Sequence, residues 1–389
     1  MEGALSVRED PSIPEPDQPI TTSAHRTSTY TIHVAVDEDD ALRTLAKLIG
    51  DHAIAMITDE TVEELHARRI AGWLAGHGIA VQRMAIPAGE RSKSLATACH
   101  LLDWLSQTDT RRRDILLAVG GGVVIDTVGW VASAYMRGIP YINVPTTLLA
   151  QVDAAIGGKV GVDHGIAKNL IGAFYAPNAV VSCISYLTTL DVRQIRSGLA
   201  EVIKKAVISS PQLFSFIEQH LEPLLALDLS RLRSLVHAAS AIKCALVEPD
   251  PYESDLRRAL NFGHTVGHAV ETVTGYGPVL HGEAVAYGMA VAVRVAVTRG
   301  VLGHPAASRI VGLLQAAALP VVPAELPVTP AAGDVIAALT KIRQVRGGSL
   351  RFVLPTGIGS TLISDDVSDD EIRAALDDRT WVGARLSLC

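Results

Sequence analysis

The chain has 389 residues, enough to bury a substantial core, and is predicted to form two domains. Hydrophobic residues make up 48% of it, but Gly, Ala and charged residues interrupt every apolar run before it reaches the ~18 residues of a membrane-spanning helix, so none is expected. The net charge of −7 and the pI near 6.0 argue against nucleic-acid binding, while they allow a local basic pocket for an anionic small molecule.

The cysteines and the N-terminal segment predict a cytoplasmic protein. The cysteines lie far apart with no Cys-x-x-Cys, which favours neither disulfides nor a thiolate zinc site: Cys99, Cys183, Cys244 and Cys389. No basic segment followed by an apolar one opens the chain, so a secretory signal is not expected. Residues 1–28 are rich in Pro, Ser, Thr and Glu and are predicted to be a disordered tail.

From residue 29 to about 190, short β-branched runs alternate with helical patterns. This rhythm predicts an α/β domain with a parallel sheet covered by helices on both faces. The predicted strands are Thr31–Val36, Ala53–Ile57, Val81–Ile86, Ile115–Val119, Tyr141–Val144 and Val180–Cys183.

From residue 191 to 389 the strand signal fades and long helical stretches predict a second, mainly helical domain. These stretches are Gly198–Ile208, Ser230–Leu246, Asn261–Val273 and Gly282–Thr298. Arg351–Leu354 is the exception and is predicted to be a lone short strand.

The sheet half carries a signal for nucleotide binding. Gly120-Gly121-Gly122 follows a buried strand where a helix begins, and glycines there allow positive φ and let phosphate oxygens approach backbone N–H groups. Asp59 stands just past an earlier strand, where a carboxylate suits ribose hydroxyls. A simple turn explains the glycines about as well, and an N-cap explains Asp59. Together the two features favour a dinucleotide.

Several charged residues lie beyond the last of these glycines. Lys159 and Lys168 lie in a Gly-rich segment that is predicted to be a loop, and with Arg137 upstream they can converge on a phosphate or carboxylate, although each alone is typical of a solvated surface charge. Glu201 and Lys204 lie three residues apart on one face of an apolar helix. A structural ion pair explains them as well as a metal ligand beside a substrate contact.

Three histidines within about twenty residues have the spacing of a metal site. His264 and His268 are four apart in a helical run and share one face, and His281 can return to them after the turn 275–278. The structural alternative is that these imidazoles are hydrogen-bonded helix and loop residues. Divalent metals need three or four converging ligands, so the assignment depends on the rest of the chain.

The order of the polar motifs closely resembles the dehydroquinate synthase family of sugar-phosphate cyclases, over roughly residues 30–375. The motifs are Gly120-Gly121-Gly122, Met136-Arg137-Gly138, Pro145-Thr146-Thr147, Gln151-Val152-Asp153, Gly157-Gly158-Lys159, Lys168–Gly172, Gly198–Glu201, Asn261–Thr265 and His281-Gly282-Glu283. The resemblance implies a Rossmann-like NAD-binding domain (29–190) joined to a helical metal- and substrate-binding domain (191–389). It also implies a homodimer that uses NAD and one zinc or cobalt ion.

The resemblance assigns roles position by position. The metal ligands would be Glu201, His264 and His281, which makes His268 a substrate contact instead. NAD contacts would be Asp59, Glu90, Lys93, Gly121, Gly122, Asp126, Thr146, Thr147 and Lys168. Substrate contacts would be Arg137 (reaching the neighbouring subunit's site), Asp153, Lys159, Asn169, Lys204, Lys243, Glu253, Arg257, Asn261 and His268.

In the family reaction, NAD transiently oxidises a secondary alcohol of a sugar phosphate, phosphate is eliminated, the hydride returns, and an intramolecular aldol addition closes a carbocycle. This makes the expected enzyme a phosphate-eliminating carbon–oxygen lyase. A metal-dependent alcohol dehydrogenase is disfavoured because such enzymes lack the cluster of Lys159, Asn169, Lys204 and Arg257.

Departures from the family pattern bear on the substrate. The stretch Ile342-Arg343-Gln344 stands where dehydroquinate synthases carry Asp-Lys-Lys, and Arg343 would keep a positive charge for phosphate. The residue at Ile125 resembles that of the valiolone-forming cyclases, which act on sedoheptulose 7-phosphate. The residues at Asn261 and His268 differ from those that are typical of these cyclases. Arg257, whose family role is to bind a substrate carboxylate, is retained. These features favour 3-deoxy-arabino-heptulosonate 7-phosphate or its amino analogue, with sedoheptulose 7-phosphate as the alternative.

Overall fold

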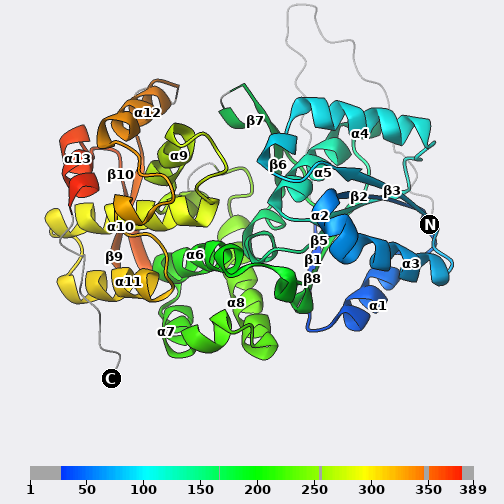
Figure 1. The fold of residues 1–389 in the computed structure, drawn as a ribbon, viewed down its shortest axis with the longest axis horizontal. Helices are drawn as coiled ribbons and strands as arrows, with labels where there is room; N and C mark the ends of the chain where they lie inside the picture. Colours follow the sequence, from blue (N-terminus) through cyan, green and yellow to red (C-terminus); the bar gives the residue numbers. More distant parts are fainter. Residues whose placement is uncertain (1–27, 166, 254–255, 346–349, 379–389) are drawn as a thin grey trace, which may run out of the picture.

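A sheet-containing half and a helical half lie side by side in the computed structural model of the chain (Figure 1). The structure describes residues 28–165, 167–253, 256–345 and 350–378, so the predicted tail lies outside the described residues except for residue 28. The predicted fold class is confirmed: a parallel sheet comes first in the chain and helices dominate the second half.

Six parallel strands form the sheet in the order β1-β8-β5-β4-β2-β3. They are β1 Thr31–Ala35, β2 Ile54–Asp59, β3 Val81–Ile86, β4 Ile115–Gly120, β5 Tyr141–Pro145 and β8 Ala179–Cys183. All six were predicted to within two residues at either end. Each residue of β4, β5 and β8 is buried, as expected of central strands that are covered on both faces.

Helices cover both faces of the sheet. Leu117 of β4 packs with α1 (Glu38–Ile49) and α3 (Arg68–Gly76), while its neighbour Leu116 packs on the opposite face with α4 (Leu95–Gln107) and α5 (Gly122–Ala134). Short helical segments complete this half: α2 Glu60–Val62, η1 Glu63–Ala67, η2 Glu90–Ser92, η3 Tyr135–Arg137, η4 Ala150–Ala154 and η5 Ile184–Thr189.

An antiparallel hairpin, β6 (Lys159–His164) and β7 (Ala167–Phe174), packs beside α5. The prediction of a Gly-rich loop here was wrong. Gly161 and Gly172 face each other across the two strands, and a Cβ on Gly172 would meet Val160 O at 3.0 Å. The glycines therefore allow close approach of two strands instead of interrupting them.

The helical half surrounds α10, which is buried from Gly282 to Ala296. The helices predicted at α6, α8, α9 and α10 are confirmed, while the predicted lone strand pairs with a second one, β10. The elements are α6 Val192–Ser209, α7 Pro211–Leu225, α8 Leu229–Val247, η6 Leu256–Asn261, α9 His264–Val273, α10 His281–Thr298, α11 His304–Ala316, η7 Pro323–Glu325, α12 Ala332–Val345, β9 Phe352–Gly357, β10 Ser360–Ser364 and α13 Asp369–Asp377.

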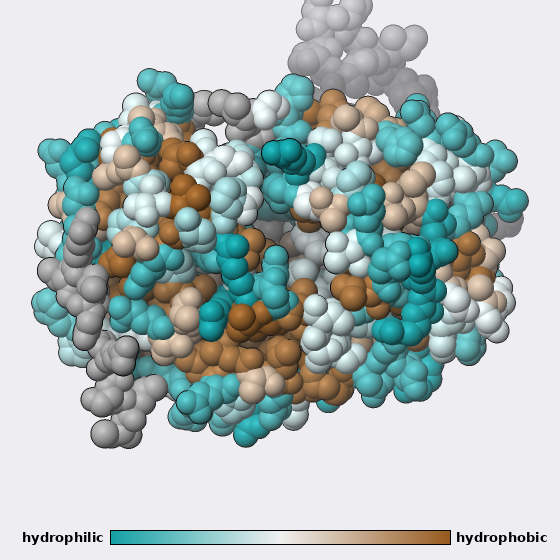
Figure 2. Space-filling model, in the orientation of Figure 1, coloured by the Kyte–Doolittle hydropathy of each residue, from teal (hydrophilic) through white to brown (hydrophobic). Residues whose placement is uncertain are grey.

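The face of the molecule shown in Figure 2 carries many hydrophilic residues, with a brown hydrophobic area near α8 and a hollow between the two halves. Among the described helices, none is both long enough and apolar enough to cross a bilayer.

Candidate active site

Close contacts between helices determine where the candidate metal-binding histidines lie. Gly263 precedes α9 with φ at 79°, in the left-handed region that favours glycine, and a Cβ there would meet Val285 O at 2.6 Å. At the start of α10, a Cβ on Gly282 would lie 2.0 Å from Ser197 O of α6, and Gly282 N donates a hydrogen bond to Ser197 Oγ at 3.0 Å. The backbones of α6, α9 and α10 therefore approach one another as only glycine permits.

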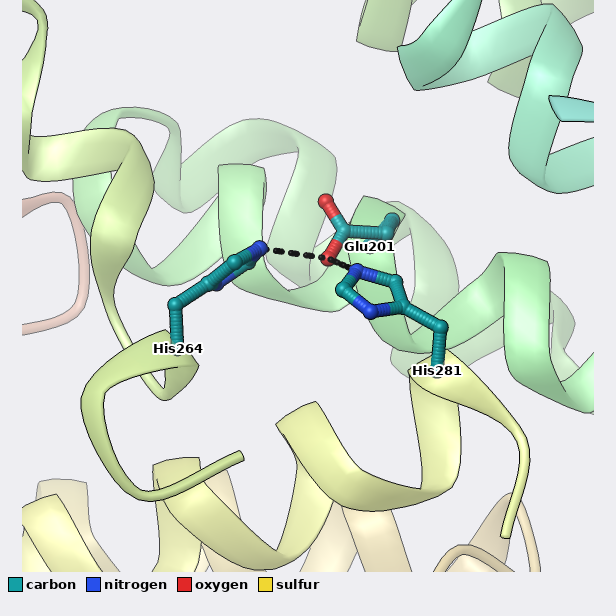
Figure 3. Close-up of side chains that lie close together, drawn as sticks. All are labelled: Glu201, His264 and His281. Carbon is teal, nitrogen blue, oxygen red and sulfur yellow. Dashed lines mark ion pairs between the residues drawn. The ribbon is translucent and has the colours of Figure 1, made fainter. Parts of the chain in front are cut away.

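Glu201, His264 and His281 point toward one another from α6, α9 and α10 (Figure 3). Glu201 Oε1 lies 3.7 Å from His264 Nε2 and 3.6 Å from His281 Nε2, and one ligand atom from each residue lies within 4.8 Å of the others. Glu201 is fully buried, and its Oε1 has no hydrogen-bond partner among the described residues. A buried carboxylate oxygen facing two imidazole nitrogens fits a divalent metal.

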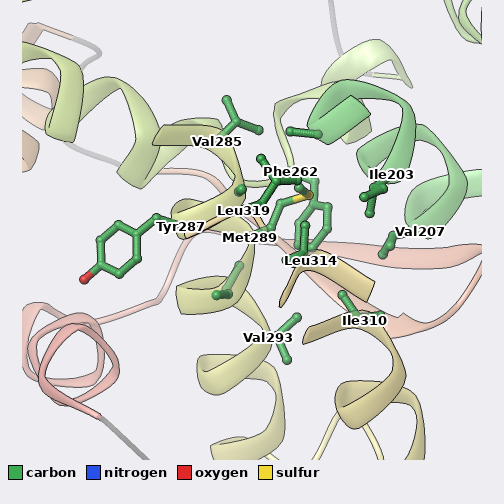
Figure 4. Close-up of a cluster of buried hydrophobic side chains, with 14 of the residues drawn as sticks. Ile203, Val207, Phe262, Val285, Tyr287, Met289, Val293, Ile310, Leu314 and Leu319 are labelled. Atoms are coloured by element: carbon green, nitrogen blue, oxygen red, sulfur yellow. The ribbon is translucent and has the colours of Figure 1, made fainter. Parts of the chain in front are cut away.

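A core of buried hydrophobic side chains lies among the helices that carry the triad (Figure 4). Phe262, two residues before His264, is buried against the same cluster as Ile203 of α6 and Met289 of α10. Because close-packed cores resist small displacements, the core fixes the spacing of the helices that carry the three side chains.

The ionisation of the three side chains bears on whether they can bind a metal. Burial opposes ionisation of Glu201, but Lys204, whose Nζ lies 2.5 Å from Oε2, helps to hold the pKa of Glu201 well below its usual range. Burial and the charge of Lys204 hold the pKa of His264 well below its usual value, so this imidazole is neutral. Burial opposes the charge of His281, but the Glu201 and Glu271 carboxylates raise its pKa to about 9. A metal needs an ionised carboxylate, as Glu201 is, and neutral imidazoles, so a metal that binds here would displace the proton of His281.

Glu271 is a site residue that the sequence reasoning missed. It is buried on α9, and its Oε1 lies 3.3 Å from His281 Nδ1. With His268 and His281 it forms a second group whose ligand atoms lie within 4.8 Å of one another. His264, His268 and Glu271 are spaced at i, i+4 and i+7, so they share one helical face, and this pattern was a usable signal.

Asp153, near the end of η4, connects the sheet half to the candidate metal triad. Its Oδ1 lies 3.0 Å from Lys205 Nζ and 2.9 Å from Lys243 Nζ. Lys205, also missed, is fully buried and lies 3.6 Å from Glu201 Oε2. Burial lowers the pKa of Lys243 to about 8 despite Asp153. Three buried ammonium groups, counting Lys204, face two carboxylates, so the pocket has a local excess of positive charge.

Three predicted substrate contacts, Lys159, Glu253 and Asn261, contact one another. Lys159 forms an ion pair with Glu253, whose Oε1 accepts a hydrogen bond from Asn261 Nδ2 at 3.1 Å. Asn169 is exposed on β7 and donates its backbone N–H to Asp163 Oδ1 at 2.7 Å. The side chain of Arg257 lies outside the described part of the chain.

A cavity of about 50 Å³ extends the site toward the C-terminal hairpin. It is lined by Asn261, His264, Thr265, His268, Ile342, Arg351, Val353 and Ile363. Arg343, predicted to bind phosphate, instead pairs with Asp369 of α13 at 2.6 Å. Ile342, the residue before it, faces the cavity, and Arg351 is the cation that lines it. Arg351 was missed because its predicted strand gave no reason to place it at the site.

The predicted nucleotide contacts gather at the carboxyl ends of β2, β4 and β5. Asp59 does cap α2, accepting hydrogen bonds at Oδ1 from the backbone N–H groups of Thr61 and Val62 at 2.9 and 3.0 Å. Burial raises the pKa of Asp59. Thr146 N donates to Gly120 O at 3.0 Å. The chain leads from β2 toward one edge of the sheet and from β4 toward the other, and ligands of open α/β sheets bind at such a point.

The positive φ that glycine allows is not used at this turn, since Gly120, Gly121 and Gly122 all have negative φ. They are needed for close packing, because a Cβ on Gly120 would meet Val124 Cγ2 at 2.6 Å and one on Gly121 would meet Thr147 Cγ2 at 3.2 Å. The same absence of side chains leaves the N-terminus of α5 open to a phosphate.

The remaining predicted NAD contacts form two ion pairs. Lys93 is buried and lies 2.5 Å from Asp126 Oδ2; burial opposes its charge, but Asp126 raises its pKa. Lys168 Nζ lies 3.1 Å from Glu90 Oε1 and 3.0 Å from Glu271 Oε1. Lys168 thus connects the predicted nucleotide contacts to the triad.

Arg137 does not join this site within one chain. It is exposed in η3, directly after the 13 residues of α5, and α5 runs from the carboxyl end of β4 for about 20 Å toward the opposite end of the sheet. Its role at a neighbouring subunit's site stays a prediction.

Comparisons with known proteins agree with this geometry. The chain matches the family model of the 3-dehydroquinate synthase N-terminal region over residues 83–197 and that of the C-terminal region over residues 198–340. It is 56% identical to a 2-epi-valiolone synthase of Actinosynnema mirum, over 97% of this chain and 99% of the relative. It is 41% identical to a 3-dehydroquinate synthase of Desulforamulus reducens, over 89% of this chain and 96% of the relative.

Among solved structures, ValA, a 2-epi-5-epi-valiolone synthase from Streptomyces hygroscopicus subsp. jinggangensis 5008 with NAD⁺ and Zn²⁺ bound, is 31% identical with a TM-score of 0.85. The match covers 92% of this chain and 98% of that one. The chain therefore belongs to the dehydroquinate synthase family of sugar-phosphate cyclases, as its motifs predicted. The two family models meet at residues 197 and 198, inside α6, while the boundary at 190 and 191 stays a prediction.

Proposed function

We propose that the protein is an NAD- and metal-dependent cyclase that converts sedoheptulose 7-phosphate to a valiolone-type carbocycle with elimination of phosphate. The convergence of Glu201, His264 and His281 beside three buried lysines carries the proposal of a metal-dependent cyclase. The choice of sugar is supported by the 56% identity, over nearly the whole length, to a 2-epi-valiolone synthase.

The cofactors would supply chemistry that side chains lack: NAD accepts and returns a hydride, and a divalent metal polarises the hydroxyl and carbonyl oxygens of the sugar. Glu201, His264 and His281 would hold the metal. Asp59, Gly121 and Thr147 would receive NAD at the carboxyl ends of the strands, where ValA, with NAD⁺ and Zn²⁺ bound, has the same fold.

The lysine cluster would bind the anionic substrate. Lys204, Lys205 and Lys243 give the pocket more positive than negative charge, which favours a phosphate and stabilises it as it leaves. Asp153 holds Lys205 and Lys243 in place, and Glu253 does the same for Lys159. Preorganised charges of this kind need little rearrangement during the reaction.

A dehydroquinate synthase-type reaction on a carboxylated heptulosonate phosphate is the second candidate. Arg257 is retained in the sequence, and 3-dehydroquinate synthases are among the similar relatives. One observation weighs toward the sugar without a carboxylate: Ile125 is a feature that this chain shares with the valiolone-forming cyclases.

The test is to compare kcat/KM for sedoheptulose 7-phosphate and 3-deoxy-arabino-heptulosonate 7-phosphate and to identify the products by NMR. We expect efficient cyclisation of sedoheptulose 7-phosphate. We also expect that Arg257→Ala leaves the ratio of kcat/KM for the two sugars unchanged, because this sugar has no carboxylate for Arg257 to bind. A preference of several orders of magnitude for the carboxylated sugar, erased by Arg257→Ala, would instead establish the second candidate.

We further propose a cytoplasmic homodimer in which Arg137 reaches the partner's site. Mixing Arg137→Ala with an inactive Glu201→Gln chain tests this. In a mixed dimer one site lacks both residues and the other keeps both, so about a quarter of wild-type activity per chain should return on mixing. If the mixture of the two variants has no more activity than the two variants measured separately, the shared site is contradicted.

A further inference from the structure

Glu271 joins three elements through one carboxylate. From α9, its Oε1 contacts His281 Nδ1 of α10 at 3.3 Å and Lys168 Nζ of β7 at 3.0 Å. Lys168 in turn contacts Glu90 and lies 4.8 Å from the centre of the Tyr276 ring. The carboxylate is therefore held from two sides.

The burial of Glu271 needs an explanation. Its side chain is 3% exposed, and Oε2 is buried without a hydrogen-bond partner among the described residues. A half-satisfied buried carboxylate costs stability, and an ion pair to the partly exposed Lys168 recovers little of that cost. A purely structural role would be better served by an apolar residue in this position.

We propose that Glu271 is a positioning residue for the metal ligand His281, an inference that rests on the proposed metal dependence. His281 turns Nε2 toward Glu201 and Nδ1 toward Glu271. A carboxylate at Nδ1 keeps the proton on that nitrogen, which leaves the Nε2 lone pair directed at the metal and fixes the ring plane. Glu271 thereby strengthens metal binding without touching the metal.

The competing arrangement makes Glu271 a direct ligand together with His268 and His281, since these three also converge. Only one of the two groups contains His264, and only the other contains His268. His264→Ala and His268→Ala therefore distinguish the two arrangements.

Cobalt binding to the metal-free full-length protein provides the test, because its visible absorption reports affinity and coordination without any turnover. For Glu271→Gln, which keeps the shape but removes the charge, we expect the Co²⁺ affinity to fall about 10–100-fold with one ion still bound per chain. Thr272→Val is the matched control: it is the next residue on α9, bonds Tyr276 and His268 O, and should leave the affinity within about threefold of wild type.

Equal Co²⁺ affinity in Glu271→Gln and Thr272→Val would overturn the proposal, even if both variants melt at a lower temperature. Loss of the ion in His268→Ala together with its retention in His264→Ala would overturn it in favour of direct ligation. If His264→Ala loses the ion while Glu271→Gln binds it normally, the proposed metal centre stands and the positioning role alone fails.

Discussion

At the residue scale, the site is organised around one buried carboxylate. Glu201 faces two imidazoles through Oε1 and two ammonium groups through Oε2, so it is shared between the metal triad and the lysine cluster. Removing one partner from such a buried set leaves an uncompensated charge, which costs about 3–5 kcal/mol. We therefore expect the residues of this cluster to depend strongly on one another.

His264→Ala should abolish both bound metal and turnover, whereas His268→Ala, four residues along the same helix, should keep one metal per chain. The reason is that His264 Nε2 faces Glu201, while His268 belongs to the group predicted to contact substrate. Metal content per chain after dialysis measures the difference. One metal per chain in His264→Ala would show that the ligand assignment is wrong.

His66 gives the sheet half a sensitivity to acid. It is buried beside Tyr186, bonds Thr189 Oγ1 at 3.1 Å, and burial, aided by Arg69, lowers its pKa to about 4. The unfolded chain takes up this proton near pH 6.5, and the folded chain only near 4, so stability falls as the pH drops through that window.

His66→Gln should remove this acid sensitivity. Between pH 7 and 5 we expect wild type to lose about 1–2 kcal/mol more stability than the variant, a figure reduced for screening by water. Denaturant unfolding at both pH values measures it. Parallel losses in the two proteins would mean that His66 is not the group that titrates.

The sequence predicted residues whose chemistry is local and missed those whose role arises from tertiary contacts. The convergence of Glu201, His264 and His281 could be predicted because metal ligands need particular residue types at particular spacings. Lys205 is i+4 from Glu201 and shares its face, yet a lysine beside another lysine resembles an ordinary solvated helix surface. Lys205 is completely buried because α8 and η4, which are distant in the sequence, pack against α6.

At the element scale, the crossing of α6 and α10 sets the distance between Glu201 and His281. Gly282 lies against the backbone of Ser197, four residues before Glu201. Any side chain at this crossing would push the helices apart by moving backbone, since the nearest atoms belong to no flexible side chain. The contact between these two helices is therefore part of the proposed metal site.

Gly282→Ala should destabilise the protein by about 1–3 kcal/mol or more and weaken metal binding, because its Cβ would meet Ser197 O at 2.0 Å. Gly333→Ala is the control: it lies in the first turn of α12 with nothing within 4 Å, so alanine should be neutral or slightly stabilising. Denaturant unfolding and Co²⁺ titration measure both effects. Wild-type metal affinity in Gly282→Ala would contradict the link between crossing and site.

Element prediction succeeded where burial is two-sided. The strands β2, β4 and β5 are continuous apolar runs because both faces are covered, and this pattern is visible in the sequence. The hairpin β6–β7 was missed because its glycines and charged residues break the apolar alternation. In addition, two large apolar residues of the hairpin do not mark a buried face, since Leu170 and Phe174 are 62% and 50% exposed.

At the scale of the whole molecule, the two halves meet where the functional groups are. The carboxyl end of the sheet supplies Asp59, Gly121 and Thr147, and the helical half supplies the triad. Asp153 and Lys168 cross between them, pairing with Lys205 and Glu271. A substrate bound in this region would lie next to both a nucleotide and a metal, which transient oxidation within one site requires.

The central claim is a cyclase that uses NAD without consuming it, and one measurement tests it most directly. Purified protein loaded with NAD and metal is given sedoheptulose 7-phosphate, and inorganic phosphate and NADH are followed together. We predict one phosphate released for each carbocycle formed, with no net accumulation of NADH, because the hydride returns to the molecule that supplied it. Accumulation of one NADH per sugar, without phosphate release, would contradict the account and indicate an alcohol dehydrogenase.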